Sequence, residues 1–356
     1  MKRWPDRRIL DLFGVTHPIV QAPMAGASTP AMAIAVSQAG GLGSLACAML
    51  SADQTRADVA AIRAAAPGPI NLNFFCHQPP AVDATREAAW RARLAPYYAE
   101  HDIELRPAAP GGGRAPFDEV FCALVEDIAP DVVSFHFGLP APSLLERVHA
   151  AGGKVIASAT TVAEARWLEA RDCDAVIAQG AEAGGHRGAF LNLDMATQVG
   201  TFALVPQVVD AVSVPVIAAG GIADARGVVA ALALGASAVQ IGTAYLFSPE
   251  ASLSDAHRAA LDEAGDDATA LTNLFTGRPA RSIVNRLMAE IGPMSELAPA
   301  FPLAAAAVAP LRSKALADGL PDFIPLWSGQ AAALAARLGA AEFTSRLAEE
   351  ALAKLL

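Results

Sequence analysis

The segment "DAVIAQGAEAGGHRG" (174–188) joins a short apolar run to a loop in which four glycines surround His186. Glycine loses more backbone freedom on folding than any other residue, so a glycine cluster indicates a chain that turns sharply or closely approaches another group. In α/β proteins, ligands bind where buried strands end in such loops. The segment therefore predicts a strand whose end presents His186 to a ligand.

Similar apolar runs recur along the chain. They are continuously apolar rather than alternating, as expected for parallel strands that are covered on both faces. The eight runs are "PIVQAP" (18–23), "GLGSLA" (41–46), "INLNFF" (70–75), "DVVSFHF" (131–137), "KVIASA" (154–159), "DAVIAQG" (174–180), "PVIAAGG" (215–221) and "SAVQIGT" (237–243).

Helical segments with recognisable ends separate these runs. Thr29 precedes Pro30 at the start of one, and the segments 160–172 and 223–235 begin near Thr or Asp and carry apolar faces. These are the residue types that cap helices. Eight strands alternating with helices predict an α/β fold of the (β/α)₈ TIM-barrel type, and a doubly wound open sheet is the alternative.

Two stretches exceed a minimal barrel. Residues 76–130 must hold more than one helix, including one within 83–105. We expect residues 1–246 to form the barrel, helices of 331–356 to complete it, and residues 247–330 to form an added, mainly helical C-terminal lobe.

Composition narrows the class of protein. Of the 356 residues, 53% are hydrophobic and 17% are charged, and the formal net charge is −10 without a basic tract, so nucleic acid is not expected as a partner. Residues 12–52 lack charged side chains, but prolines and glycines interrupt them, which argues against a membrane span. The four cysteines form no CxxC pair, so neither a metal site nor a disulfide framework is expected, and a cytoplasmic setting fits best.

The last two strand ends suggest an anion site. Gly220 and Gly221 follow the seventh run, close to a helix that begins near Asp224, and Gly242 and Thr243 follow the eighth. In TIM barrels, phosphate groups commonly bind at these two ends through main-chain N–H groups. The alternative is a pair of ordinary turns that use glycine for packing.

Three further features suit a heterocyclic ligand. The main chain of Ala22, Pro23 and Met24 can lie along a flat ring, and the alternative is that Met24 is a core residue. Asn71 and Gln179 place amides in apolar strands, where an unbonded amide is costly. Each amide can bond either to a ligand or to neighbouring main chain.

Two of the seven histidines follow strands of the expected barrel, whereas the other five have no supporting context. His136 ends the fourth run and His186 lies in the loop after the sixth, so both face the same mouth. A neutral imidazole can accept a proton or hydrogen-bond an anionic oxygen near pH 7. The alternatives are a loop histidine for His186 and a core histidine for His136.

Together the segments resemble the class I nitronate monooxygenases, the 2-nitropropane dioxygenase family, from about residue 14 to residue 330. The segments are "QAPMAGAST", "GGLGSLA", "NLNFF", "SFHFGLP", "AQGAEAGGHRG", "PVIAAGGIADARG", "QIGTAYL", "TGRPARSIVNRL" and "LWSGQ". The resemblance implies that the barrel, residues 1–246, binds FMN non-covalently. It also implies that the lobe covers the substrate.

The reaction that the resemblance implies is oxidative denitrification of alkyl nitronates by O₂ to a carbonyl compound and nitrite, with propionate 3-nitronate as the natural substrate. His186 would be the active-site histidine and His136 its neighbour near the nitronate. No nucleic acid or membrane partner is implied, and the protein would be a monomer or homodimer. The residues expected to contact FMN are Ala22, Pro23, Met24, Asn71, Gln179, Gly184, Gly185, Gly220, Gly221, Gln240, Ile241, Gly242 and Thr243.

The chain departs from the family at Phe301, where the family often has Tyr, and Lys314 is a candidate pocket cation. One competing interpretation is a flavin-dependent NAD(P)H reductase, of the quinone or enoyl-ACP type, on the same barrel. Such reductases share the Gly-Gly-His loop, whereas "SFHFGLP" and "TGRPARSIVNRL" favour the oxygenase. Another is a phosphate-ligand-binding barrel without turnover.

Overall fold

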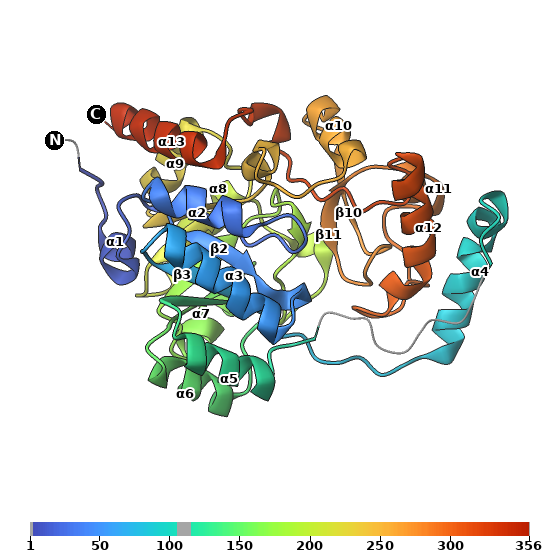
Figure 1. The fold of residues 1–356 in the computed structure, drawn as a ribbon, viewed down its shortest axis with the longest axis horizontal. Coiled ribbons are helices and arrows are strands. Elements are labelled where there is room, and N and C mark those ends of the chain that lie inside the picture. The colour runs from blue at the N-terminus through green and yellow to red at the C-terminus, as the bar shows by residue number, and fades with distance from the viewer. Residues whose placement is uncertain (1–2, 105–114, 356) are drawn as a thin grey trace.

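A closed parallel barrel forms the larger part of the molecule (Figure 1). The computed structural model describes residues 3–104 and 115–355. All eight predicted strands are present and parallel. They are β1 (Ile19–Gln21), β2 (Gly43–Ala46), β3 (Ile70–Phe75), β4 (Val132–His136), β5 (Lys154–Ala159), β6 (Ala175–Gln179), β8 (Val216–Ala219) and β9 (Ala238–Ile241).

Strand β1 closes the barrel between β9 and β2. Val20 pairs with Gln240 in β9 and forms a parallel bridge to Leu42, just before β2. This closure excludes the doubly wound open sheet. Helix α1 (Arg8–Phe13) packs Ile9 and Phe13 into a buried cluster with interior strand residues.

Helices cover the outside of the barrel. They are α2 (Pro30–Gln38), α3 (Ala52–Ala65), α5 (Glu119–Ile128), α6 (Pro142–Ala150), α7 (Val162–Glu169), α8 (Thr201–Val209), α9 (Ala225–Ala233) and α13 (Ala340–Lys354). The side chains of Thr29, Thr161 and Asp224 cap α2, α7 and α9 by accepting a main-chain N–H, as their sequences predict. Short 3₁₀ turns lie at Cys47–Met49, Met195–Thr197, Thr243–Phe247 and Ala332–Leu334.

A second, smaller unit with its own hydrophobic core lies beside the barrel (Figure 1). It contains α10 (Asp255–Glu263), β10 (Thr269–Thr272), β11 (Ala280–Ile283), α11 (Arg286–Ile291) and α12 (Ala304–Asp318). Strands β10 and β11 form an antiparallel sheet with β7 (Gly185–His186), which the sequence analysis did not predict. This sheet joins the lobe to the glycine loop of the barrel.

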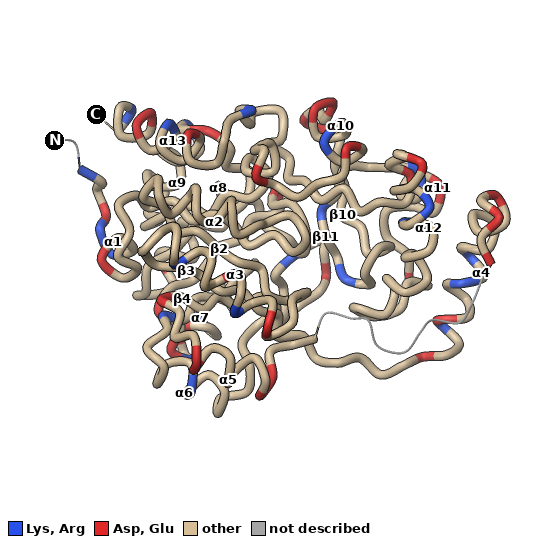
Figure 2. The backbone as a smooth tube through the Cα atoms, in the orientation of Figure 1, with Lys and Arg blue, Asp and Glu red and all other residues tan. Residues whose placement is uncertain are grey.

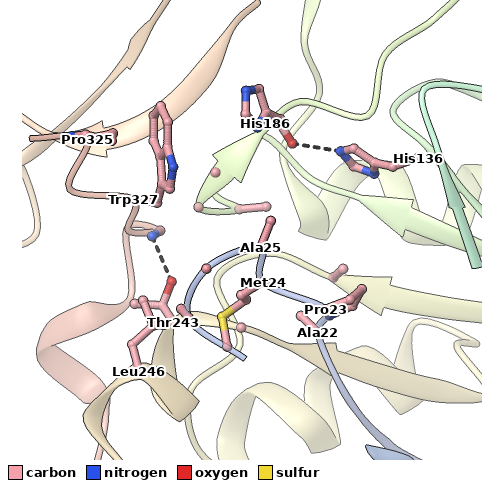
Figure 3. A pocket seen from close by; sticks show the side chains of 18 of the residues that line it. Ala22, Pro23, Met24, Ala25, His136, His186, Thr243, Leu246, Pro325 and Trp327 are labelled. Atoms are coloured by element: carbon pink, nitrogen blue, oxygen red, sulfur yellow. Dashed lines mark hydrogen bonds between the residues drawn. The ribbon is translucent and has the colours of Figure 1, made fainter. Parts of the chain in front are cut away.

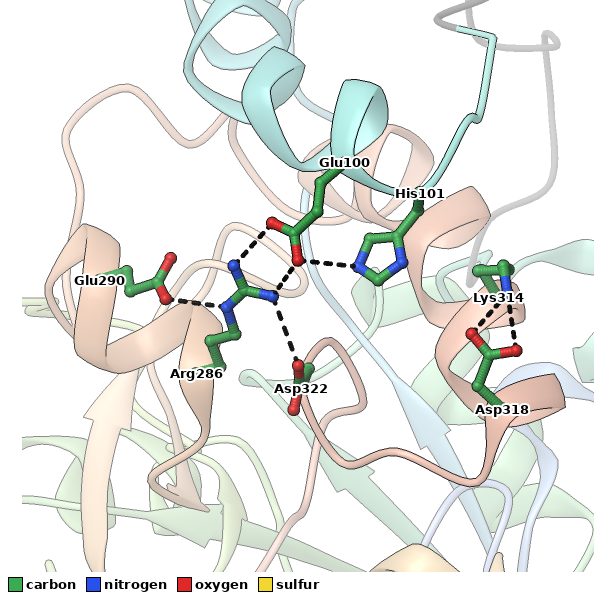
Figure 4. Close-up of polar contacts among 7 residues, drawn as sticks. All are labelled: Glu100, His101, Arg286, Glu290, Lys314, Asp318 and Asp322. Atoms are coloured by element: carbon green, nitrogen blue, oxygen red, sulfur yellow. Dashed lines mark hydrogen bonds and ion pairs between the residues drawn. The ribbon is translucent and has the colours of Figure 1, made fainter.

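Helix α4 (Ala84–Glu100), which lies within the expected helical stretch 83–105, packs on the lobe rather than on the barrel (Figure 1). Leu105 falls outside the described residues. The Trp90 and Tyr98 side chains donate hydrogen bonds to main-chain oxygens of α12. Arg286 of α11 bonds to both carboxylate oxygens of Glu100 at 2.7 Å (Figure 4). The lobe is therefore built from two separate parts of the chain.

Charged residues lie mainly on the outer helices and loops, with both signs interleaved (Figure 2). Within the described part of the chain, no helix has the length and hydropathy that a membrane span requires. The four cysteines are all free thiols.

Candidate active site

A cavity of about 310 Å³ lies where the carboxyl ends of the barrel strands meet the lobe (Figure 3). Most of the residues singled out in the sequence line it. They are Ala22, Pro23, Met24, His136, Gln179, Gly184, Gly185, His186, Gly220, Gly221, Gln240, Gly242 and Thr243.

Two of the expected ligand-binding residues do not line the cavity. The Asn71 side chain is fully buried in β3 and donates to the Ser44 hydroxyl at 3.0 Å. Ile241 is buried in the barrel core, and its carbonyl oxygen accepts from the Ala22 N–H. Asn73 lines the cavity instead and donates to the Ser134 hydroxyl at 2.9 Å. The sequence could have favoured Asn73 over Asn71, because Asn73 lies nearer the carboxyl end of β3 and the site lies at that end of the barrel.

The lobe fixes the position of His186. In the β7–β11 ladder His186 pairs with Ala280, and its Nε2 lies 2.9 Å from the Thr276 hydroxyl. The imidazole is 5.4 Å, centroid to centroid, from each of the Phe301 and Trp327 rings. Gly185 reaches this ladder with a φ of +69°, which suits glycine. The histidine is thus held by its main chain, its ring nitrogen and its ring faces.

Two side chains from the barrel hold the same loop from the other side. The His186 carbonyl oxygen accepts from Gln179 Nε2 at 3.1 Å and from His136 Nε2 at 3.2 Å (Figure 3 shows the second bond). The Gln179 Oε1 accepts from the Gly188 N–H at 2.8 Å. Of the two alternatives for the Gln179 amide, the structure shows bonds to neighbouring main chain.

The geometry around His136 fixes its tautomer. Because the His186 carbonyl can only accept, His136 Nε2 carries the proton, and Nδ1 accepts from the Ser158 hydroxyl at 3.1 Å. Burial lowers the pKa of His136 to about 4, and the charges of Arg278 and Arg187 act in the same direction. His136 is therefore neutral near pH 7 with both nitrogens engaged, an arrangement that favours positioning of the loop over proton transfer.

A buried arginine behind the loop was missed in the sequence. The Arg187 side chain is 1% exposed and donates to the main-chain oxygens of Gln179 and Gly180, at 2.8 and 2.6 Å. Burial lowers the pKa of Arg187 to about 10, so it remains a cation near pH 7. The sequence shows an arginine directly after the histidine, but the burial of its charge becomes evident only in the folded glycine loop.

The two late glycine turns lie at one end of the cavity. Gly220 and Gly221 adopt φ values of +108° and +71°. The Thr243 hydroxyl accepts from the Gly329 N–H at 2.9 Å, which brings the segment "LWSGQ" (326–330) against this end. The Asp224 carboxylate caps α9 by accepting a main-chain N–H, so the N-terminus of this helix already has an acceptor from the chain itself.

One buried polar atom in the cavity wall has no partner among the described residues. Gln240 Oε1 is buried and makes no hydrogen bond, although Gln240 lines the cavity at the end of β9. An unsatisfied buried acceptor is costly, so this atom suits a ligand N–H. Met24 also lines the cavity, just beyond β1, the strand that pairs with the strand of Gln240. This end of the cavity suits a planar heterocycle that carries hydrogen-bond donors.

Lys314 and His257 differ from expectation. Lys314 is not a pocket cation: it pairs with Asp318 on α12, away from the cavity lining (Figure 4). His257, one of the five histidines without supporting context in the sequence, lines the cavity, and its Nε2 atom lies 3.2 Å from the Trp327 carbonyl oxygen. Phe301 packs beside His186, with ring centroids 5.4 Å apart, and is not among the residues that line the cavity.

The closed barrel, the cavity at its strand ends and the histidine loop together define a (β/α)₈-barrel enzyme. Comparison with known families identifies which one. A family model described as nitronate monooxygenase matches residues 6–350. The chain belongs to the nitronate monooxygenase family and is an oxidoreductase; enzymes of this family are in general flavin-dependent.

Individual relatives cover almost the whole chain. A nitronate monooxygenase of Pseudomonas aeruginosa is 44% identical over 346 residues, which are 96% of this chain and 98% of the relative. One of Paraburkholderia phytofirmans is 42% identical, over 97% and 94% of the two chains. Among solved structures, nitroalkane oxidase from Streptomyces ansochromogenes has a TM-score of 0.87 at 40% identity, covering 97% of each chain. FabK from Thermotoga maritima has a TM-score of 0.73 at 28% identity, covering 98% and 96%.

Proposed function

We propose that this chain binds FMN in the cavity and oxidises alkyl nitronates with O₂ to a carbonyl compound and nitrite, with propionate 3-nitronate as the natural substrate. The observation that carries the proposal is that one cavity is lined both by the fixed His186 and by Gln240, whose buried Oε1 has no hydrogen-bond partner among the described residues. FMN would supply the redox chemistry, as acceptor of electrons from the nitronate and donor of electrons to O₂.

The cofactor would be held by several of the residues that line this cavity. Gln240 Oε1 would accept a flavin N–H, Met24 would lie against the ring, and the Gly220–Gly221 and Gly242–Thr243 turns would bind the phosphate.

His186 would bind the reacting anion. A nitronate carries its charge on the nitro oxygens, and an imidazole at the wall of the cavity can hydrogen-bond such an oxygen. Thr276, Gln179 and His136 hold the ring and its backbone in place, so little reorganisation is needed when the substrate binds.

The charge of the cavity supports a substrate with a second anionic group. Arg312 of α12 is the one Lys or Arg among the described residues that line the cavity. The other charged lining residue, Glu182, accepts hydrogen bonds from the main chain and hydroxyl of Thr201. Arg312 would therefore bind the carboxylate of propionate 3-nitronate at the mouth.

Aerobic nitrite release by the flavin-loaded protein tests the proposal. Propionate 3-nitronate and ethylnitronate should both release nitrite, and neutral nitroethane should not. For Arg312→Gln we expect KM for propionate 3-nitronate to rise about tenfold or more, as loss of a charge-assisted hydrogen bond predicts, with KM for ethylnitronate unchanged. Rapid anaerobic bleaching of the flavin by NADH, without nitrite release from either nitronate, would favour the reductase instead. A purified protein that takes up no flavin would favour a non-catalytic barrel.

A further inference from the structure

Two distant segments meet behind the histidine loop. The guanidinium carbon of Arg278 lies 4.0 Å from the centroid of the Phe137 ring. Phe137 belongs to "SFHFGLP" (134–140) and Arg278 to "TGRPARSIVNRL" (276–287), the segments that in the sequence favoured the oxygenase over the reductase. In the fold they form one contact, in which a planar cation covers an aromatic ring.

Phe137 stands in an uncommon backbone conformation. Its φ is +72°, in the left-handed region that non-glycine residues seldom adopt and that persists only where the surroundings impose it. The ring lies 4.6 Å from the imidazole of His136 and 5.9 Å from that of His186, centroid to centroid. Phe137 is 4% exposed, so its buried ring packs against both histidines.

Arg278 contacts both the Phe137 ring and the main chain that follows His186. One guanidinium nitrogen donates to the Ala189 carbonyl oxygen, three residues beyond His186, and Nε is buried without a hydrogen-bond partner among the described residues. Arg278 also shares a turn with Thr276, whose hydroxyl contacts His186 Nε2. Burial lowers the pKa of Arg278 to about 10, so it carries its charge at neutral pH.

We propose that Arg278 is a positioning residue that acts through Phe137 and the Ala189 carbonyl to hold His186 at the cavity, and that its charge also favours binding of an anionic substrate. The shape of the guanidinium serves the first role, because an ammonium cannot cover a ring and bond a carbonyl in the same plane. The charge alone serves the second. The kinetic test rests on the proposed nitronate turnover.

Arg278→Lys and Arg278→Met separate the two roles, with kcat and KM measured for ethylnitronate, which has no carboxylate to engage Arg312. For Arg278→Met we expect kcat to fall and KM to rise, each about tenfold. For Arg278→Lys we expect KM within about twofold of the parent value and kcat still reduced. A merely structural role would lower the thermal midpoint and the active fraction of both variants but leave KM of the surviving enzyme unchanged, which would overturn the proposal.

A second comparison tests whether the two residues act as a unit. Phe137→Leu combined with Arg278→Lys should lower kcat no further than the more affected single variant, because both changes disrupt the same packing against the two histidines. Independent, multiplied losses would overturn the proposal, and this arm keeps a positive charge at position 278 should Arg278→Met fail to fold.

Binding of nitrate, a planar oxyanion followed by flavin absorbance, gives a readout without turnover. Its dissociation constant should rise about tenfold in Arg278→Met and stay near the parent value in Arg278→Lys. Absence of nitrite from the parent enzyme would refute the proposed function only, whereas equal nitrate affinity in parent and Arg278→Met would refute the role of Arg278.

Discussion

The Nε2 atom of His136 lies 3.2 Å from the main-chain oxygen of His186, so one histidine donates a hydrogen bond to the backbone that presents the other. Gln179 donates to the same oxygen, and both partners come from barrel strands, whereas the Thr276 hydroxyl that meets the His186 ring comes from the lobe. The reactive end of the cavity is therefore assembled from two parts of the fold. Changes in either part should alter turnover.

Replacing His186 with Asn should slow nitronate turnover by about 10²-fold or more while the protein retains its flavin. Asn keeps a polar side chain but cannot provide an imidazole at the wall of the cavity, and loss of one positioned hydrogen-bond donor to the reacting charge commonly costs a factor of this size. Nitrite release under saturating substrate checks the expectation. His149→Asn is the matched control, because His149 lies on α6 near Asp174, and it should leave turnover unchanged. Parent-like turnover by the His186→Asn variant would contradict the assignment.

The barrel was predictable because its signals are local and repeated. Each strand is a short apolar run, and the caps at Thr29, Thr161 and Asp224 lie in the sequence beside the helices that they start. The glycine loop indicated the site for the same reason, because the glycines that let its backbone turn lie within a few residues of one another.

The remaining parts of the site depend on contacts between distant segments. β7 has two residues and becomes a strand only because β11 pairs with it. The choice of Asn73 over Asn71 depends on how far each stands along β3 from the end that meets the cavity. The placement of Arg278 on Phe137 joins positions far apart in the chain.

Gln179→Leu should destabilise the glycine loop and slow turnover about tenfold or more. The change leaves the buried Gly188 N–H unsatisfied, which costs about 1–3 kcal/mol. It also removes one of the two hydrogen bonds to the His186 carbonyl, which keeps the bond from His136. Urea unfolding and nitrite release measure the two effects.

Gln179→Glu separates the two hydrogen bonds of this amide. A carboxylate can still accept from the Gly188 N–H, but it cannot donate to the His186 carbonyl and repels it. We expect Gln179→Glu to be as slow as Gln179→Leu, which would place the catalytic importance in the bond to His186. Parent-like turnover in both variants would show that the loop keeps its position without Gln179.

The free energy of unfolding should fall as pH is lowered from about 6.5 to about 4, in part because of His136 and His257. Burial lowers the pKa of each to about 4, compared with 6.5 for an ordinary histidine, so between these values the unfolded chain takes up protons that the folded chain excludes. The stabilisation is complete above pH 6.5 and is lost on acidification, by about 3 kcal/mol per histidine.

Urea unfolding at pH 7, 6 and 5 compares the parent protein with His257→Gln, whose amide can still donate to the Trp327 carbonyl. The variant should lose less stability per pH unit, since one titrating group is gone. A pH dependence identical to that of the parent would mean that His257 titrates alike in the folded and unfolded chains.

Gly242→Ala should weaken FMN binding without unfolding the protein. Gly242 has a negative φ of −112°, so no left-handed conformation excludes alanine, and a Cβ there would meet Ala22 and Met24 at ordinary contact distances of 3.4 and 3.6 Å. The added methyl would narrow the part of the cavity that Gly242, Ala22 and Met24 line, where the cofactor should lie. We expect the dissociation constant for FMN, measured by fluorescence titration of the flavin-free protein, to rise about tenfold or more while the thermal midpoint of that protein changes little.

Gly68→Ala, whose Cβ would meet open space, is the control and should bind FMN as the parent does. Unchanged FMN affinity in the Gly242→Ala variant would place the cofactor elsewhere in the barrel.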